Sequence, residues 1–518
     1  MPIGEKTSMW GVWCCGSWNF KDCTNSKCFR PHVCAKCANP HHKARSCSAY
    51  SNPTSQTQLF EGIQKSGQAL DVRQWTVLIS ASAKTGDTKR CMDLFQKMEQ
   101  QGIKPNEVTW NTLISSFAKT GDTERCMDLF QKMEQQGIKP DEVTWTTLIS
   151  ACAKGASLEL GKHLHCCIMA CGIMPGVILN ATLIDMYAKS GSLRDAEVIY
   201  HGIAEDERDV VVYTAMISGY GVHGNGKEAM KVYEEMQHKR VKPNEITFIA
   251  LLSACSHAGM VNEAEYLFDC METEFGILPA IEHKTCMVDV YGRSGDLEKA
   301  QNFLHKISQP SAATWTALLG AYRTHGNVEG AEYVAQKILE LEPTNASAYV
   351  LLANIYRAAG HSDAAKRVRE QMDHCGVKKI PGQTWVEVNG KRHTFVVHDQ
   401  SHESTEEIYH KLRELIAEAK EAGYSPITSL VLHDVSEETK EELICYHSEK
   451  LAIAYLHTVL DPFSYAQGPA IQKNLRSCLD CHNFFKTLTK LYPYELPLRD
   501  ANRFHVFKNG QCSCGDYY

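Results

Sequence analysis

No stretch of this chain approaches the roughly 18 consecutive apolar residues that a membrane-spanning helix needs, so we expect a soluble protein with no membrane partner. The opening residues, Met1-Pro-Ile-Gly-Glu-Lys, lack the apolar core of a secretory signal. An excess of positive charge is also absent, because 54 Lys and Arg stand against 61 Asp and Glu, a formal net charge of −7. This balance excludes a protein that holds nucleic acid mainly by bulk charge, but not one that binds it by stacking and hydrogen bonding.

Disulfides are not expected, although the chain has 22 cysteines. Seven of them lie in the first 50 residues and five lie after residue 440, whereas ten are scattered between. Clusters of cysteine and histidine in a large chain without a secretion signal indicate metal sites rather than disulfides. The scattered cysteines, such as Cys91, Cys126 and Cys255, are expected to fill helix cores as small apolar residues.

The 518 residues contain an internal repeat. Residues 75–110 and 110–145 are identical at 30 of 36 aligned positions. Weaker copies follow, and together they predict seven units over 72–106, 107–141, 142–176, 177–209, 210–244, 245–280 and 281–311. Such a repeat is the signature of a solenoid, in which neighbouring units stack because one unit cannot bury its apolar face alone.

Each unit is predicted to be a pair of helices. In the second copy Trp110, Leu113, Ile114 and Phe117 follow the i, i+3, i+4, i+7 spacing of one helix face. Asp122 can cap a second helix, in which cysteine, leucine, phenylalanine and methionine repeat this spacing. A glycine and a proline at 137 and 140 then end it.

A 35-residue helical hairpin with the phrases KPNEVTW and KPDEVTW resembles the pentatricopeptide repeat (PPR) family, in its plant-type PLS subclass. The resemblance implies binding of single-stranded RNA at roughly one base per repeat. In that family the fifth and the last residue of a unit read the base. The corresponding pairs that we expect to read A, U and A are Thr76 with Asn106, Asn111 with Asp141, and Thr214 with Asn244. Without the resemblance, a protein-binding helical scaffold would be nearly as good an interpretation.

Beyond the repeats, residues 312–379 resemble the E-type helical motifs that follow PLS repeats. Residues 381–390, PGQTWVEVNG, resemble the PG box of the same proteins. Strand-like alternation at Trp385, Val386 and Val388 marks a change of fold class near residue 380. We interpret residues 49–71 as a polar linker.

Two half-motifs that suit a catalytic zinc follow. His447-Ser-Glu449 gives H-x-E, and Cys478-Leu-Asp-Cys481 gives C-x2-C. A catalytic zinc needs three protein ligands and one open position for water, and one imidazole with two thiolates supplies those three. Glu449 could then sit beside the water and move its proton, as in the zinc deaminases that act on cytosine or adenine. Alone, His447 could be a core histidine, and Cys478 with Cys481 a structural knuckle.

The phrases HSEKLA, CLDCH and the C-terminal segment from Arg503 to Tyr518 are similar to the DYW domain of plant-type organellar RNA editing factors, over residues 381–518. This resemblance implies a zinc-dependent cytidine deaminase of α/β fold with Glu449 as proton shuttle. It also implies a second, structural zinc, which we assign to His482, His505, Cys512 and Cys514. The family's final tryptophan is Tyr518 here.

The first 48 residues carry two further metal-binding patterns. Cys34-x2-Cys37-x4-His42-x4-Cys47 has the ligand spacing of a zinc knuckle, and Cys14-x8-Cys23-x4-Cys28-x3-His32 resembles a CCCH finger. Cys15 could replace Cys14, and His41 could replace His42. Both types are associated with RNA, although a small structural zinc module is the alternative.

The sequence therefore predicts a mostly α-helical PPR solenoid, an α/β deaminase-like domain at its C-terminal end and a small N-terminal zinc-finger module. The predicted function is sequence-specific RNA binding with zinc-dependent conversion of cytidine to uridine. The alternatives are an RNA-binding specificity factor without deaminase activity, the reverse uridine-to-cytidine reaction, and a protein-binding scaffold. The resemblance implies that the protein is located in a mitochondrion or plastid. It also implies editing helper proteins as partners. No clear transit peptide is visible, so the cytoplasm or nucleus stays open.

Overall fold

The computed structural model describes residues 6–7, 13–14, 70–379, 381–431, 435–461, 463, 468–501 and 503–516. The chain divides into two compact units, residues 1–151 and residues 152–518. None of the helices in the described residues combines the length and the apolar character that a membrane crossing requires.

The first unit is built from helical hairpins preceded by the short antiparallel pair β1 and β2. Its elements are β1 (Lys6–Thr7), β2 (Trp13–Cys14), α3 (Val72–Lys84), α4 (Thr88–Gln100), α5 (Glu107–Ala118), α6 (Thr123–Gln135) and the greater part of α7 (Glu142–Gly155).

Helix α6 shows why the repeat sequence folds in this way. The Asp122 side chain accepts a hydrogen bond from the Arg125 amide at 3.1 Å and so caps the helix, as its position predicted. Cys126 and Met133 lie in the core, 1% and 0% exposed. After the helix, Gly137 takes a φ of +75°, the left-handed conformation that glycine adopts without strain.

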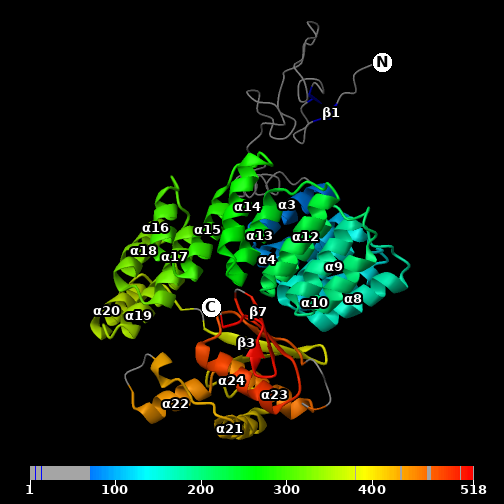
Figure 1. Ribbon diagram of the computed structural model, residues 1–518. Helices are drawn as coiled ribbons and strands as arrows, with labels where there is room; N and C mark the ends of the chain where they lie inside the picture. Colours follow the sequence, from blue (N-terminus) through cyan, green and yellow to red (C-terminus); the bar gives the residue numbers. More distant parts are fainter. Residues whose placement is uncertain are drawn as a thin grey trace. The chain divides into compact units, whose positions relative to one another are not determined.

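The second unit continues the helical hairpins. The first helix of each hairpin packs against the first helix of the next, in the order α9, α11, α13, α15, α17 and α19. Figure 1 shows these hairpins following one another in chain order from cyan to yellow-green. The helices are α8 (Leu158–Ala170), α9 (Val177–Lys189), α10 (Leu193–Gly202), α11 (Val210–Val222), α12 (Gly226–His238), α13 (Glu245–Ala258), α14 (Val261–Thr273), α15 (Ile281–Ser294), α16 (Leu297–His305), α17 (Ala312–His325), α18 (Val328–Leu341), α19 (Ala346–Ala358) and α20 (Ser362–His374). The predicted α-solenoid is confirmed.

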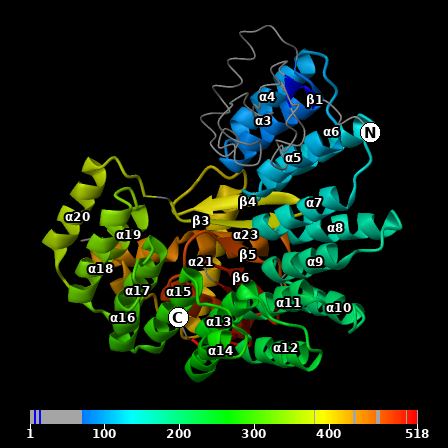
Figure 2. The same cartoon turned by 90° about the horizontal axis from the view of Figure 1, so that it is seen from above.

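The chain then changes to a mixed sheet of order β4-β3-β5-β6-β7-β8, in which β5 and β6 run parallel and the other neighbours antiparallel. Helix α23 packs against β3, β4 and β5 (Figure 2). Helix α24 packs against β7 and β8. The elements are β3 (Gln383–Val388), β4 (Lys391–Val396), α21 (Thr405–Glu421), η3 (Thr428–Leu430), α22 (Glu437–Cys445), α23 (Ser448–Val459), β5 (Ile471–Lys473), α24 (Leu479–Leu491), β6 (Leu496–Arg499), β7 (Phe504–Lys508) and β8 (Gln511–Cys512).

Strand β3 lies where the alternation predicted a strand. Thr384, Val386 and Val388 are buried, whereas Trp385 is half-buried on the other face, where the Arg392 guanidinium lies 4.1 Å from its ring centroid. Because side chains alternate across a strand, Trp385 cannot share a face with its neighbour Val386.

Three residues near β6 and β7 fasten this sheet to the helical hairpins of the same unit. Arg499 donates a hydrogen bond to the Lys189 carbonyl at the end of α9, at 2.9 Å, and Arg503 donates one to the His257 carbonyl in the last turn of α13, also at 2.9 Å. The Phe504 ring stacks on that of His223, with centroids 4.5 Å apart. Cationic side chains satisfy the carbonyls that the end of a helix leaves without intrahelical partners.

Candidate active site and metal centres

The predicted ligands of the catalytic zinc come together at the N-termini of two helices. His447 immediately precedes α23, and Cys478 immediately precedes α24 with Cys481 in its first turn. The His447 Nδ1 atom lies 3.4 Å from the Cys478 Sγ and 3.5 Å from the Cys481 Sγ. All three ligand atoms lie within 4.8 Å of one another.

These distances fit a tetrahedral zinc ion. With Zn–S near 2.3 Å and Zn–N near 2.0–2.1 Å, two ligand atoms of a tetrahedral site are about 3.6 Å apart. The pKa of the Cys478 thiol lies well below its ordinary value because Cys481 donates a hydrogen bond to it and, against the effect of burial, His447 lies beside it. A thiolate is the form that binds metal.

Glu449 lies in the first turn of α23 and is fully buried. It forms an ion pair with Lys473 of β5. The Ser448 hydroxyl lies 3.2 Å from one of its carboxylate oxygens, and the Ser477 hydroxyl lies 3.4 Å from the other. Burial raises the pKa of Glu449, but Lys473 and then His447 outweigh it and hold this pKa below its usual value. The carboxylate is therefore charged where it lies.

A second buried ion pair joins the two helices that carry the ligands. Lys450 of α23 donates to Asp480 of α24 at 2.6 Å, and both side chains are fully buried. Lys450 also donates to the Tyr424 hydroxyl at 2.7 Å and to the Ile444 carbonyl at 3.2 Å. Asp480 accepts further bonds from that hydroxyl and from the Ile427 amide. Both buried charges, on Lys450 and on Asp480, thus have several hydrogen-bond partners, as buried charges require.

The four residues that we assigned to a structural zinc also converge. The His482 Nε2 lies 3.2 Å from the Cys514 Sγ, and the His505 Nδ1 lies 3.6 Å from the Cys512 Sγ. Their ligand atoms lie within 4.8 Å of one another, and two nitrogens with two sulfurs make a complete tetrahedral donor set. This cluster ties α24 to β7 and β8 at the C-terminal end of the domain.

The other predicted ligands belong to the first 48 residues. Cys14 belongs to β2, and the remaining N-terminal ligands lie outside the described residues, namely Cys23, Cys28, His32, Cys34, Cys37, His42 and Cys47. Tyr518 also lies outside the described residues.

The predicted base-reading pairs share one geometry, which a buried threonine creates. Thr109 contacts the Thr76 hydroxyl at 2.7 Å and donates to the Asn106 side chain at 2.9 Å. Thr144 joins Asn111 to Asp141 in the same way, at 2.7 Å to each.

In the second unit, Thr247 contacts the Thr214 hydroxyl at 2.7 Å and donates to Asn244 at 3.0 Å. Asn106 and Asn244 also cap the following helices. One side chain of each pair is thus fixed at a helix start.

One further pair of this kind was missed by the sequence analysis. Thr314 contacts the Thr285 hydroxyl at 2.7 Å and the Ser311 hydroxyl at 2.9 Å, and these are the fifth and last residues of unit 281–311. The threonine three residues after the end of the unit was the available signal. The partners of Glu449 and Asp480 were missed as well, because a lysine in a sequence is usually a surface residue.

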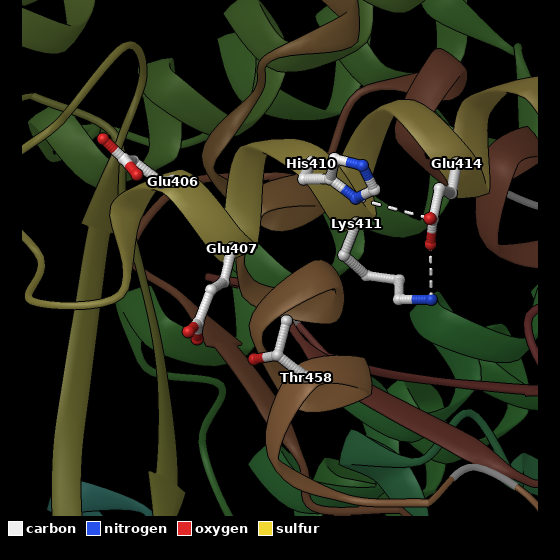
Figure 3. Close-up of a pocket in the computed structure, with 6 residues that line it drawn as sticks. All are labelled: Glu406, Glu407, His410, Lys411, Glu414 and Thr458. Carbon is white, nitrogen blue, oxygen red and sulfur yellow. Dashed lines mark ion pairs between the residues drawn. The ribbon is translucent and has the colours of Figure 1, made fainter.

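A shallow hollow between α21 and the end of α23 is no rival site. Its volume is about 480 Å³, and Figure 3 shows Lys411 and His410 both directed at Glu414, at 2.6 Å and 3.3 Å. It contains none of the cysteine and histidine ligands. The lining residues are Glu406, Glu407, His410, Lys411, Glu414 and Thr458.

Models of known protein families match three parts of the chain. Residues 423–518 match the DYW family of nucleic acid deaminases, and residues 325–387 match the E motif. PPR family models match 58–120, 105–154, 143–173, 208–257, 246–274 and 284–309. The chain thus carries pentatricopeptide repeats, an E motif and a C-terminal DYW-family deaminase domain.

Among individual proteins, the chain is 45% identical over 313 residues to pentatricopeptide repeat-containing protein CRR2, chloroplastic, of Arabidopsis thaliana, covering 60% of this chain and 47% of that protein. It is 44% identical over 314 residues to the mitochondrial protein At3g26782 of the same plant, covering 60% and 47%. The chain therefore spans less than half the length of these relatives. The crystal structure of PPR10 in complex with an 18-nt psaJ RNA element aligns with a TM-score of 0.47 and 21% identity, over 62% of this chain and 48% of that one.

Proposed function

We propose that this chain binds single-stranded RNA with its helical repeats and converts a cytidine of that RNA to uridine in its C-terminal domain. The observation that carries the proposal is the meeting of a buried, charged Glu449 with His447, Cys478 and Cys481 at two helix N-termini. This is the residue set of a hydrolytic base deaminase, in which cytidine and water give uridine and ammonia.

In this reaction Glu449 moves protons. It accepts one proton from the water that adds to C4 of the cytosine and passes it to the ring nitrogen N3. It then takes the second proton from the new C4 hydroxyl and gives it to the amino group, which leaves as ammonia. His447, Cys478 and Cys481 would hold the zinc ion, which would lower the pKa of that water and so supply a nucleophile near neutral pH. Lys473 stabilises the carboxylate form in which Glu449 can accept a proton.

RNA reading is assigned to the residue pairs that a threonine joins. Thr76 with Asn106, Asn111 with Asp141, and Thr214 with Asn244 are proposed to read A, U and A from 5′ to 3′. Thr285 and Ser311 share their geometry and are proposed as a fourth pair. The cytidine then lies a few nucleotides 3′ of the last base read.

The second cluster, with His482 and Cys514, is proposed as a structural zinc site, because four protein ligands leave no position for water. The chloroplastic and mitochondrial names of the relatives support an organelle as the place of action. We also propose that helper proteins take part in the editing reaction.

The test is transcriptome sequencing of bacteria that express the intact chain, Glu449→Ala or the exposed control Glu437→Ala. We expect C-to-U sites with the intact chain and the control, and none with Glu449→Ala. Sites in all three would refute the role of Glu449. Sites in none, with soluble and zinc-loaded protein, would favour a specificity factor without its own activity. That alternative has one observation in its favour, since both oxygens of Glu449 already have partners within the domain.

A further inference from the structure

A cavity of about 760 Å³ lies within residues 152–518. Four first helices of the hairpins, α13, α15, α17 and α19, line it on one side. Leu475, Arg476 and Ala501 of the C-terminal domain line it on the other. The hydrogen bonds of Arg499 and Arg503 to the ends of α9 and α13 hold these two sides together.

The lining of this cavity is strongly basic. Arg293, Arg323, Lys379 and Arg476 contribute to it, against the single carboxylate of Asp289. That carboxylate already accepts a hydrogen bond from the Arg293 Nε at 2.8 Å. The lining of the cavity therefore contains three more basic side chains than carboxylates.

The arginines lie near enough to affect one another. Arg293, Arg323 and Arg476 all line this one cavity of about 760 Å³. Bringing like charges together costs free energy, which an anionic ligand would recover.

The cavity also lies next to both proposed functional regions. Arg476 is followed by Ser477 and Cys478, the first beside Glu449 and the second in the metal cluster. On the opposite side, Asp289 lies one helical turn after Thr285, which belongs to the most C-terminal of the threonine-joined pairs.

We propose that this cavity binds the phosphates of the RNA segment between the last base read and the cytidine to be deaminated. The inference rests on the proposed function, which supplies the 5′-to-3′ direction from repeats to deaminase. Arginine is suited to such a role because its planar guanidinium can donate two hydrogen bonds to one phosphate. A cavity that holds only the backbone would position the segment without selecting its sequence.

The experiment measures binding of two RNA oligonucleotides to the full chain by fluorescence anisotropy. The short one, 5′-AUNNANN-3′, covers the seven repeats, and the long one adds six random nucleotides at the 3′ end. The intact chain is compared with Arg323→Gln/Arg476→Gln. A control, Arg194→Gln/Arg413→Gln, removes the same charge from exposed positions that do not line the cavity.

We expect the intact chain and the control to bind the long oligonucleotide more tightly than the short one. In the cavity variant this gain in affinity should be smaller by a factor on the order of ten, while the affinity for the short oligonucleotide is unchanged. The gain should also depend less on salt in the variant. Two lost contacts at a slope of about 0.7 each correspond to about sevenfold between 50 and 200 mM salt. If the double variant melts early, Lys379→Gln at an exposed position should still remove about half of that slope.

An unchanged gain in both cavity variants would overturn the inference, and so would an equal loss in the control. Failure of the intact chain to bind either oligonucleotide would instead refute RNA binding itself, and the inference with it. Tight binding of the short oligonucleotide with no gain from the extension would overturn the cavity assignment alone.

Discussion

The buried pair of Lys450 and Asp480 offers a sharp test of how the two ligand-bearing helices are held together. Replacing Lys450 by methionine keeps most of the length of the side chain but removes its charged end. Asp480 then stays buried without its cation, while the Tyr424 hydroxyl and the Ile427 amide continue to donate to it. The variant thus changes one charge at the junction of α23 and α24.

Removal of one partner from a buried ion pair costs about 3–5 kcal/mol, because the other charge is left without compensation. The two donors that remain on Asp480 place this case at the lower end, about 3 kcal/mol. The further change Asp480→Asn removes the uncompensated charge and keeps an acceptor for both donors. Lys450→Met/Asp480→Asn should therefore be more stable than Lys450→Met alone.

The assay is hydrogen exchange of the full chain followed by mass spectrometry, read in peptides from α23 and α24. A loss of about 3 kcal/mol speeds exchange there roughly 100-fold, at 1.4 kcal/mol for each factor of ten. Lys231→Met serves as the control, since its pair with Glu228 is exposed at 67% and 46%. Exposed pairs contribute about 0–1 kcal/mol, so exchange in α12 should change less than about fivefold.

Two results would refute this reasoning. One is an effect of Lys450→Met as small as that of the control, which would mean that water or a rearrangement compensates Asp480 at little cost. The other is a double variant less stable than the single one, which would mean that the charge on Asp480 is favourable by itself.

Three further outcomes are expected. Cys481→Ser should lower the zinc content by about one ion per chain in elemental analysis, whereas Cys445→Ser, buried but outside both clusters, should not. Asp141→Asn should move the edited sites away from U at the base facing unit 107–141. The pKa of Asp141 is lowered to about 2 in the folded chain, since the bonds from Thr144 and other partners outweigh burial. Its contribution to stability is then complete above pH ~4 and lost toward pH 2, and the asparagine variant should show a smaller fall in melting temperature over that range. Arg499→Ala should speed exchange in the last turn of α9 about tenfold, by loss of one hydrogen bond from a charged donor.

Local sequence signals predicted the helices well and the sheet poorly. Asp122 and the spacing of Cys126 with Met133 act within one helix, so the pattern and the structure agree there. Strand β6 contains a proline and is buried on both faces, with Leu496 and Leu498 on one and Pro497 on the other, so its sequence shows no alternation of apolar and polar residues. Its parallel pairing with β5 depends on chain segments about 25 residues apart.

The candidate site divides in the same way. The half-motifs H-x-E and C-x2-C nominated the three ligands and Glu449 only in combination, because each of them alone also has a structural interpretation. Nothing in the sequence indicated that Lys473 would lie against Glu449. Nor did it indicate that Lys450 would pair with Asp480. These contacts arise only when β5, α23 and α24 pack together.

The charges in this core form a connected set that favours a divalent metal. Glu449 and Asp480 are buried carboxylates, and metal binding requires Cys478 and Cys481 as thiolates, which makes four negative charges. The two lysines in contact with the carboxylates supply two positive ones. A dication at the cluster brings the sum of these groups to zero, and buried charge is stable only when it is compensated. Charge balance thus leads independently to the ion that the ligand distances fit. It also explains why two lysines lie in the interior of the domain, where lysine is otherwise rare.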